Sequence, residues 1–242
     1  MSQRTNAKKQ ALRSAKPGCL SVFLKAPEPG RVKTRLAAKV GKRRATALYR
    51  AMVLDTLSWA SRSSTIDCRV DSAPPARAAM CAELFQRPLR RVPHYCQSEG
   101  NLGTRMAHAF RSMFTAGYKR CVIIGTDCPT LGPSQVSTAF EALRDADLVL
   151  GPTADGGYYL IGLRRRPDPA LLRGIAWSTK EVLTQTLGRA TSLGLQTALL
   201  PKACDIDTVA DLPPLKRELL ARWERGERPF PVRTLRALEW EF

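Results

Sequence analysis

An aspartate directly follows the clearest strand-forming stretch of the chain. Residues 121–125 form a continuous apolar run, and Thr126 and Asp127 come immediately after it. A carboxylate at the end of a buried parallel strand faces the crevice in which open α/β sheets bind their ligands. Carboxylate oxygens suit Mg²⁺ or Mn²⁺, and one Asp is adequate when a diphosphate carries the metal in. The alternative is that Asp127 only caps a turn before Pro129.

A second acidic cluster surrounds Asp207, close to the end of the last apolar run. Thr208 and Asp211 have the spacing of a capping box for a short helix, and this accounts for both of them. It leaves Asp205 and Asp207 unexplained. If the preceding strand lies beside the strand that ends at Asp127, then Asp207 completes a metal site from the opposite side.

A basic loop, residues 25–36, joins the first predicted strand to its helix. Backbone amides and a helix N-terminus favour anions at such a junction. Lys33 and Arg35 are suited to act as fixed counter-charges for phosphoryl oxygens. No GxxxxGK[ST] loop is present, so P-loop hydrolysis is not favoured. The loop contains four cations, namely Lys25, Arg31, Lys33 and Arg35.

A glycine pair with a preceding acid, Asp155, Gly156 and Gly157, lies between two further predicted strands. Paired glycines let a ligand approach the backbone, and the acid can accept a hydrogen bond from a sugar hydroxyl or take a proton. An Asp-Gly hairpin turn is an equally good interpretation of this segment. The two interpretations are compatible.

Strand-sized apolar runs that alternate with helix-period segments predict an α/β fold around these residues. We expect a flexible basic tail at 1–18, a single folded domain at 19–215, and a helical appendage and tail at 216–242. Asn101 is placed to cap the helix that follows it. The strands are expected at 20–25, 66–70, 121–125, 147–151, 158–163 and 195–200, with an extended segment at 89–95. One or two helices are expected at 34–60, and single helices at 74–85, 102–114, 133–143 and 179–186.

Composition limits the class of protein. The chain has 242 residues, of which 44% are hydrophobic, and seven scattered cysteines with no CxxC pair, which excludes a disulfide miniprotein and argues against wholesale disorder. No secretory h-region or membrane-span-length run is present, so we expect a cytoplasmic protein, with an Arg-rich transit peptide as the alternative. The net charge of +18 favours anionic partners. A nucleic-acid-binding protein is less favoured, because no recognised RNA or DNA motif accompanies this charge.

Six ordered motifs resemble those of the DUF2064 family, the transferase 1 proteins associated with radical SAM and selenodomain proteins. The resemblance covers roughly residues 19–215. It implies similarity to the nucleotide-diphospho-sugar transferases of the GT-A fold and, more distantly, to guanylyltransferases that act on phospholactate or the molybdenum cofactor. The motifs read, in order, KAPEPGRVKTRL, QSEGNLGTRM, GTDCPTL, GPTADGGYYLIGL, WST and DIDTVADL.

The resemblance implies a GT-A-like three-layer sandwich with a mixed, mostly parallel sheet. It also implies a role for each matching position: Lys25, Arg31, Lys33 and Arg35 in the nucleotide and phosphate loop, Asp127 and Asp207 as metal ligands, and Asp155, Gly156 and Gly157 facing the sugar or acceptor. Two positions depart from the family pattern. Asp127 is followed by Cys128 and Pro129 instead of completing an Asp-x-Asp motif, and Asn101 stands where relatives often carry Asp.

These residues predict a Mg²⁺- or Mn²⁺-dependent transferase with a nucleotide-activated donor and a small-molecule acceptor. The favoured reaction is glycosyl transfer from a nucleotide-sugar, with the nucleoside diphosphate leaving. The alternative is nucleotidyl transfer, in which the acceptor attacks the α-phosphorus of a nucleoside triphosphate and pyrophosphate leaves. In either case the metal and the loop cations would stabilise the charge that develops on the leaving group. A non-catalytic ligand sensor on the same fold is a further alternative.

Overall fold

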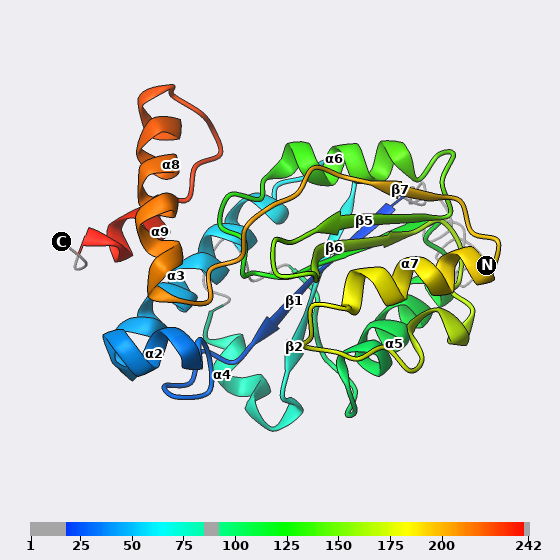
Figure 1. Cartoon of the computed structure of the whole chain (residues 1–242), viewed down its shortest axis with the longest axis horizontal. Coiled ribbons are helices and arrows are strands. Elements are labelled where there is room, and N and C mark those ends of the chain that lie inside the picture. Colours follow the sequence, from blue (N-terminus) through cyan, green and yellow to red (C-terminus); the bar gives the residue numbers. More distant parts are fainter. Residues whose placement is uncertain (1–17, 85–91, 240–242) are drawn as a thin grey trace, which may run out of the picture.

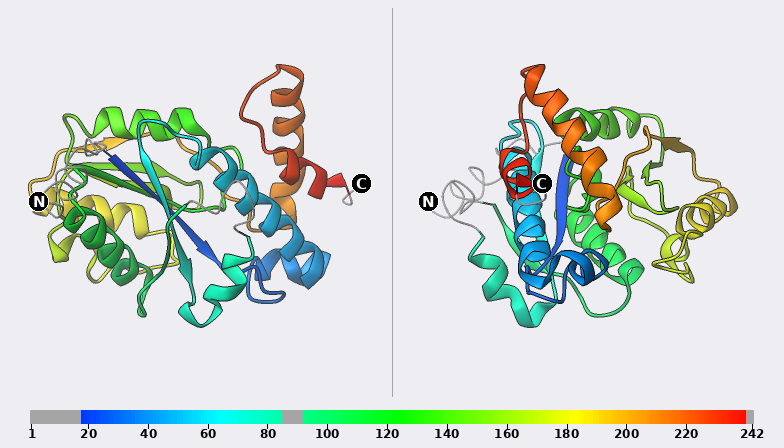
Figure 2. Two further views of the ribbon diagram at one scale, coloured as in Figure 1. Left: turned by 180° about the vertical axis from the view of Figure 1, so that it is seen from behind. Right: turned by 60° about the vertical axis from the view of Figure 1, so that its left-hand side comes forward.

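The computed structural model describes residues 18–84 and 92–239, which form a seven-stranded sheet covered by helices on both faces (Figures 1 and 2). The strand order is β3-β2-β1-β4-β6-β5-β7. All neighbouring strands are parallel except for β6, which runs antiparallel to both β4 and β5. The strands are β1 Gly18–Lys25, β2 Asp67–Ala73, β3 His94–Cys96, β4 Arg120–Ile124, β5 Leu148–Pro152, β6 Tyr158–Leu163 and β7 Thr197–Leu199.

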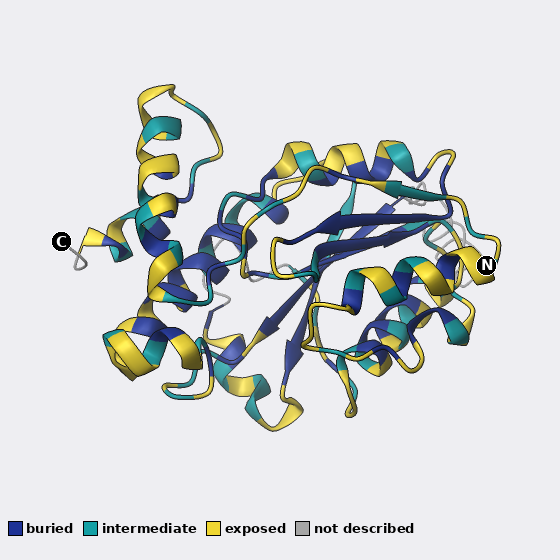
Figure 3. Cartoon of the chain, viewed as in Figure 1, coloured by how far each residue is buried: buried dark blue, intermediate teal, exposed yellow. Residues whose placement is uncertain are grey.

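The helices α3, α4 and α6 pack on one face of the sheet, and α5 and α7 pack on the other (Figure 2). The central strands are therefore buried on both sides and appear dark in Figure 3. This arrangement confirms the predicted GT-A-like three-layer α/β sandwich. The helices are α2 Thr34–Val40, α3 Lys42–Ala60, α4 Ala78–Ala82, α5 Leu102–Thr115, α6 Pro133–Ala142, α7 Val182–Ser192, α8 Leu212–Glu224 and α9 Val232–Ala237.

The C-terminal helices extend the domain to one side (Figure 1). A third apolar cluster joins Leu36 of α2 and Met52 of α3 to Leu215 and Leu219 of α8, with Leu238 after α9. Asp55 of α3 also accepts hydrogen bonds from the backbone and side chain of Thr234 in α9. The segment that we predicted as an appendage thus shares a core with α2 and α3.

The segment 34–60, expected to form one or two helices, forms two, α2 and α3, because the positive φ of 89° at Gly41 interrupts the helix. The observed elements differ from the predicted ones in two places. The helix expected at 179–186 begins at Val182 and continues to Ser192, after a turn closed by the Thr179 hydroxyl on Ala176. A short 3₁₀ turn, Pro75–Arg77, precedes α4 in the helix expected at 74–85. Most of the predicted basic tail and part of the extended segment 89–95 lie outside the described residues.

Candidate active site

A cavity of about 570 Å³ opens at the carboxyl ends of β1 and β4. This is the edge at which ligands bind in open α/β sheets. All four predicted cations of the basic loop line this cavity, and so do both predicted metal ligands. The basic loop, Asp127 and Asp207 are separated from one another by about 80 residues or more along the chain. These six residues are Lys25, Arg31, Lys33, Arg35, Asp127 and Asp207.

Asp207 reaches the cavity by a different path from the one expected. The strand before it, β7, lies at the edge of the sheet, separated from β4 by β5 and β6. The chain after β7 crosses back over the strand ends, where the Ile206 amide donates to the carbonyl of Asp127 at 3.0 Å. This crossing segment, not an adjacent strand, brings Asp207 to Asp127. The capping box of Thr208 and Asp211 is also present and holds the same segment in place.

Lys33 lies between the two acids. Its ammonium is 2.5 Å from Oδ1 of Asp127 and 3.1 Å from Oδ1 of Asp207, and its side chain is only 4% exposed. The backbone of Lys33 adopts φ 47° and ψ 48°, a left-handed conformation that is uncommon for a residue with a Cβ. Sterically unfavourable backbone of this kind concentrates at functional sites. The geometry thus directs a buried cation at a pair of carboxylates.

The charges around Lys33 keep it protonated. Burial by itself lowers the pKa of a lysine, but Asp127 and Asp207 outweigh burial and raise the pKa of Lys33 above its ordinary value. Arg35 adds a longer contact, 3.5 Å from its Nη1 to Oδ2 of Asp207. The lysine ammonium therefore serves as the counter-charge of both carboxylates.

The carboxylate pair has the chemistry of a partial divalent-metal site. Two acids converge on one point, and their side chains remain 52% and 37% exposed, so their outer oxygens are accessible. Magnesium is often held by one or two carboxylates together with substrate phosphates and water. Within 18–84 and 92–239 no group of three or more acidic, Cys or His side chains is arranged for a metal. Asp127 and Asp207 thus fit a metal that arrives with a phosphate ligand.

Tyr49 of α3 fixes the strand ends beneath these charges. Its hydroxyl accepts a hydrogen bond from the Lys25 amide at 2.8 Å and lies 3.4 Å from the Thr126 hydroxyl. Burial raises the pKa of Tyr49, so the group stays a neutral phenol. Tyr49 was not among the predicted site residues, because a tyrosine on an amphipathic helix has the pattern of an ordinary core residue.

The opposite wall contains a further cation, Arg105 of α5. Its guanidinium donates to the side-chain oxygen of Gln97 at 3.1 Å, and the Gln97 amide in turn donates to the Asp71 carbonyl at 2.8 Å. Burial lowers the pKa of Arg105, which nevertheless remains charged. Asn101 caps α5 as predicted, accepting from the Thr104 amide at 2.9 Å. Arg105 and Gln97 were missed, although both belong to a motif that the sequence singles out.

The Asp155 loop forms a tight turn outside this cavity. Oδ1 of Asp155 accepts from the Thr153 hydroxyl at 2.6 Å and from the Gly157 amide at 3.0 Å. Gly156 has φ 90°, and a Cβ there would collide with the backbone of Lys180. The close approach at Gly156 is therefore to the chain itself. The role of Asp155, Gly156 and Gly157 toward a ligand stays a prediction.

Asp205 connects that turn to the carboxylate pair. Burial raises the pKa of Asp205, and the negative charges of Asp155 and Asp207 raise it further. Asp205 is thus close enough to both acids for their negative charges to disfavour its own ionised form. In the sequence, Asp205 stood out because the capping box of Thr208 and Asp211 does not explain Asp205 or Asp207.

The fold and the cleft together define a protein of the nucleotide-diphospho-sugar transferase class. A solved structure from Desulfovibrio desulfuricans, which carries this class as a provisional name, is 32% identical and superposes with a TM-score of 0.81 over 93% of this chain and 95% of its own. The chain belongs to the DUF2064 family, described as "Uncharacterized protein conserved in bacteria", whose model matches residues 56–179. The predicted family is thereby confirmed.

A curated relative is a guanylyltransferase by name, and a more distant solved structure shares the fold. The phosphoenolpyruvate guanylyltransferase of Chloroflexus aggregans is 27% identical over 206 residues, covering 81% of this chain and 93% of its own. The 4-diphosphocytidyl-2C-methyl-D-erythritol synthase of Anaerococcus prevotii shares the fold at 11% identity, with a TM-score of 0.56 over 85% of this chain and 98% of its own. The chain is thus a transferase, as predicted. None of its described helices is long and apolar enough to span a bilayer.

Proposed function

We propose that the protein transfers a nucleoside monophosphate from a nucleoside triphosphate to a small phosphorylated or carboxylated acceptor, with release of pyrophosphate. The observation that carries the proposal is the arrangement of the cleft, in which loop cations surround the Asp127–Asp207 pair at the strand ends. The similarity to a phosphoenolpyruvate guanylyltransferase supports it and makes GTP the first donor to test. The sequence alone favours glycosyl transfer over nucleotidyl transfer, and the present proposal reverses that preference.

The loop cations have a defined task in this reaction. Arg31, Lys33 and Arg35 surround the place where the triphosphate would enter, and Lys33 would exchange its carboxylate contacts for phosphoryl oxygens. The acceptor oxygen forms a bond to the α-phosphorus while the bond to the bridging oxygen breaks, and pyrophosphate leaves with that electron pair. Cations held near the leaving oxygens stabilise the charge that develops there.

Asp127 and Asp207 would hold Mg²⁺ or Mn²⁺ on the phosphates. When bound, the metal would neutralise phosphate charge and polarise the reacting phosphoryl group. The two carboxylates are positioned for this by the backbone bond between Ile206 and Asp127 and by the capping box after Asp207. They act as metal ligands and take no proton in the reaction.

The charge of the cleft fits an anionic acceptor. Five cations and two acids line it, Arg105 being the one cation contributed by α5. Arg105 lines the cavity from a different element than the basic loop, so its guanidinium is available to a carboxylate or phosphate of the second substrate. A neutral acceptor would leave this partly buried guanidinium without an anionic partner.

Glycosyl transfer from a nucleotide-sugar is the second candidate. It is favoured by the provisional name of the 32% identical structure and by the Asp155 turn, which holds a carboxylate close enough to Asp205 to raise the pKa of Asp205. In this reaction the acceptor attacks the anomeric carbon and a nucleoside diphosphate leaves. The leaving group therefore distinguishes the two candidates.

The test is a product assay with GTP, ATP, CTP and UTP, and with UDP- and GDP-sugars, each with Mg²⁺ or Mn²⁺ and a panel of phosphorylated and carboxylated acceptors. We expect acceptor-dependent pyrophosphate release from one triphosphate, at least about 100-fold slower in Asp127→Asn. Asp145→Asn, an exposed acid away from the cleft, is the matched control. Release of a nucleoside diphosphate from a nucleotide-sugar would favour the second candidate, and no turnover with any pair would leave a ligand sensor.

A further inference from the structure

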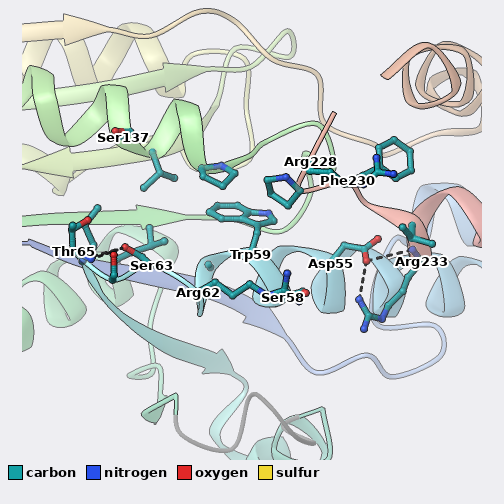
Figure 4. Close-up of a pocket in the computed structure, with 18 of the residues that line it drawn as sticks. Asp55, Ser58, Trp59, Arg62, Ser63, Thr65, Ser137, Arg228, Phe230 and Arg233 are labelled. Carbon is teal, nitrogen blue, oxygen red and sulfur yellow. Dashed lines mark hydrogen bonds and ion pairs between the residues drawn. The ribbon is translucent and has the colours of Figure 1, made fainter. Parts of the chain in front are cut away.

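A second and larger hollow, of about 1040 Å³, lies on the α3 and α6 side of the sheet. Its walls are the last turns of α3, the loop 61–66, the start of α6 and the segment 228–236 that includes α9 (Figure 4). None of its lining residues lines the cleft described above. It is therefore a separate site, and the proposed reaction makes no use of it.

One part of this hollow is apolar and aromatic. Trp59 projects into it from α3, and Phe230 lies at the other end, beyond Asp55 and Arg228 (Figure 4). Val136, Pro133 and Pro229 complete the apolar surface. Aromatic walls of this kind pack against flat, ring-containing molecules.

The charge of the hollow is unbalanced. It is lined by four arginines, Arg62, Arg228, Arg233 and Arg236, and by one acid, Asp55. Both carboxylate oxygens of Asp55 already accept hydrogen bonds. Arg233 donates to Oδ1 at 3.1 Å, and the backbone amide and hydroxyl of Thr234 donate to Oδ2 at 2.7 and 2.8 Å. The single acid thus compensates one arginine only.

Two of the arginines have no protein counter-charge. Among the described residues, the guanidinium groups of Arg62 and Arg236 take part in no hydrogen bond or ion pair. Arg62 comes from the loop that follows α3, and Arg236 comes from α9. Arg228 donates to the backbone carbonyl of Glu227 at 2.7 Å and makes a cation–π contact, 4.8 Å from the centre of the Trp223 ring, so neither of these contacts is with a carboxylate. The hollow therefore combines an aromatic surface with a positive rim.

We propose that this hollow binds a small organic anion, with a ring system against Trp59 and a phosphate or carboxylate bound by the arginines of its rim. The volume exceeds what drug-sized ligands need, so the site accommodates a molecule of nucleotide or aryl-phosphate size. Arginine binds both phosphate and carboxylate in bidentate geometry. The ion pair between Arg233 and Asp55 fixes the C-terminal wall, which makes the site part of the fold and not a chance opening.

The experiment is calorimetric titration of the full chain with 1-naphthyl phosphate, which carries both features of the ligand. The reference compounds are 1-naphthol, which has the ring without the charge, and inorganic phosphate, which has the charge without the ring. The test variant is Arg62→Ala with Arg236→Ala, since both side chains are exposed and make no hydrogen bond or ion pair within residues 18–84 and 92–239; we therefore expect the fold to tolerate their loss. Arg50→Ala with Arg217→Ala removes two exposed arginines outside the hollow and is the matched control. Arg35→Ala reports any binding in the other cleft.

We expect saturable binding of 1-naphthyl phosphate that is at least tenfold weaker in the Arg62 and Arg236 variant and unchanged in the matched control and in Arg35→Ala. Both reference compounds should bind at least tenfold more weakly than 1-naphthyl phosphate. Trp59→Leu should also weaken binding, while circular dichroism shows that the variant is folded. The proposal is overturned if 1-naphthyl phosphate does not bind, if 1-naphthol binds equally well, or if only Arg35→Ala reduces binding. Turnover is not part of this test, so the result is independent of the proposed reaction.

Discussion

Replacing Lys33 by methionine should make the nucleotide-free protein bind Mn²⁺ more tightly. Methionine preserves an unbranched apolar stem and removes the charge that now lies 2.5 Å from Asp127 and 3.1 Å from Asp207. The two carboxylates then lack a nearby ammonium. A divalent cation is the natural replacement, because carboxylate oxygens are its preferred ligands.

The size of the effect follows from the charges and their exposure. Two unit charges 4 Å apart interact by about 1 kcal/mol in water and by about 4 kcal/mol at an effective dielectric constant of 20. A divalent ion doubles the repulsion from the lysine. Because Asp127 and Asp207 are 52% and 37% exposed, the water-like value applies. Removing the ammonium should then favour the metal by about 2 kcal/mol, an increase in affinity of about 30-fold.

The assay is titration of Mn²⁺ into the nucleotide-free protein, followed by calorimetry or by the electron paramagnetic resonance signal of free Mn²⁺. Lys39→Met removes an exposed charge from the same helix and should leave the affinity unchanged. Adding Asp127→Asn to Lys33→Met should abolish the gain. Turnover of Lys33→Met should fall at least about 100-fold, because the phosphates of the bound donor lose the cation that would stabilise the charge on the leaving group. An unchanged or weaker Mn²⁺ affinity in Lys33→Met would refute the reasoning.

Three further predictions concern stability. Asp55→Ala leaves the Thr234 amide and hydroxyl without their acceptor and should cost about 3 kcal/mol in urea unfolding, with faster hydrogen exchange in α9; an unchanged midpoint would contradict it. Because the hydrogen bond from Arg164 lowers the pKa of Asp147, its stabilisation is present above about pH 4 and lost below it, so thermal melts from pH 5 to 2 should show a smaller acid loss in Asp147→Asn than in wild type. Gly156→Ala should cost at least about 2 kcal/mol through its φ of 90° and the Lys180 backbone, whereas Gly188→Ala, in open space on α7, should stabilise slightly; equal effects of the two would contradict the close approach at Gly156.

Much of the fold follows from local patterns along the chain. The run 121–125 predicts a central strand because only a strand buried on both faces is apolar without alternation, and β4 is such a strand. The hairpin interpretation of the Asp155 turn makes β6 antiparallel to β5, as observed, but no pattern indicates that β6 lies between β5 and β4. Gly41 also ends α2 through a backbone conformation that the helical period of its neighbours does not reveal.

The charged residues of the site could be predicted from the sequence, because a charged residue directly after a buried strand is seldom required by the fold itself. Lys33 and Asp127 both line the cleft for this reason. Tyr49, Gln97 and Arg105 could not be found in the same way. Their roles depend on tertiary contacts, such as the Tyr49 hydroxyl on the Lys25 amide, and their residue types occur routinely in cores and helix ends.

The ion pairs that Lys33 makes with Asp127 and Asp207 explain how a phosphate-binding loop and an acidic pair can share one cavity. Sequence patterns assign the lysine to phosphate and the acids to a metal, which describes the loaded site only. In the free protein neither is present, and two carboxylates near each other would repel without a cation between them. Lys33 supplies that cation from a left-handed backbone position that directs a buried side chain at both acids. When a metal and a triphosphate enter together, the acids and the lysine would each acquire a new partner of opposite charge, so neither group is left unpaired. A metal without the nucleotide must instead displace the lysine into solvent, and therefore the two should bind cooperatively.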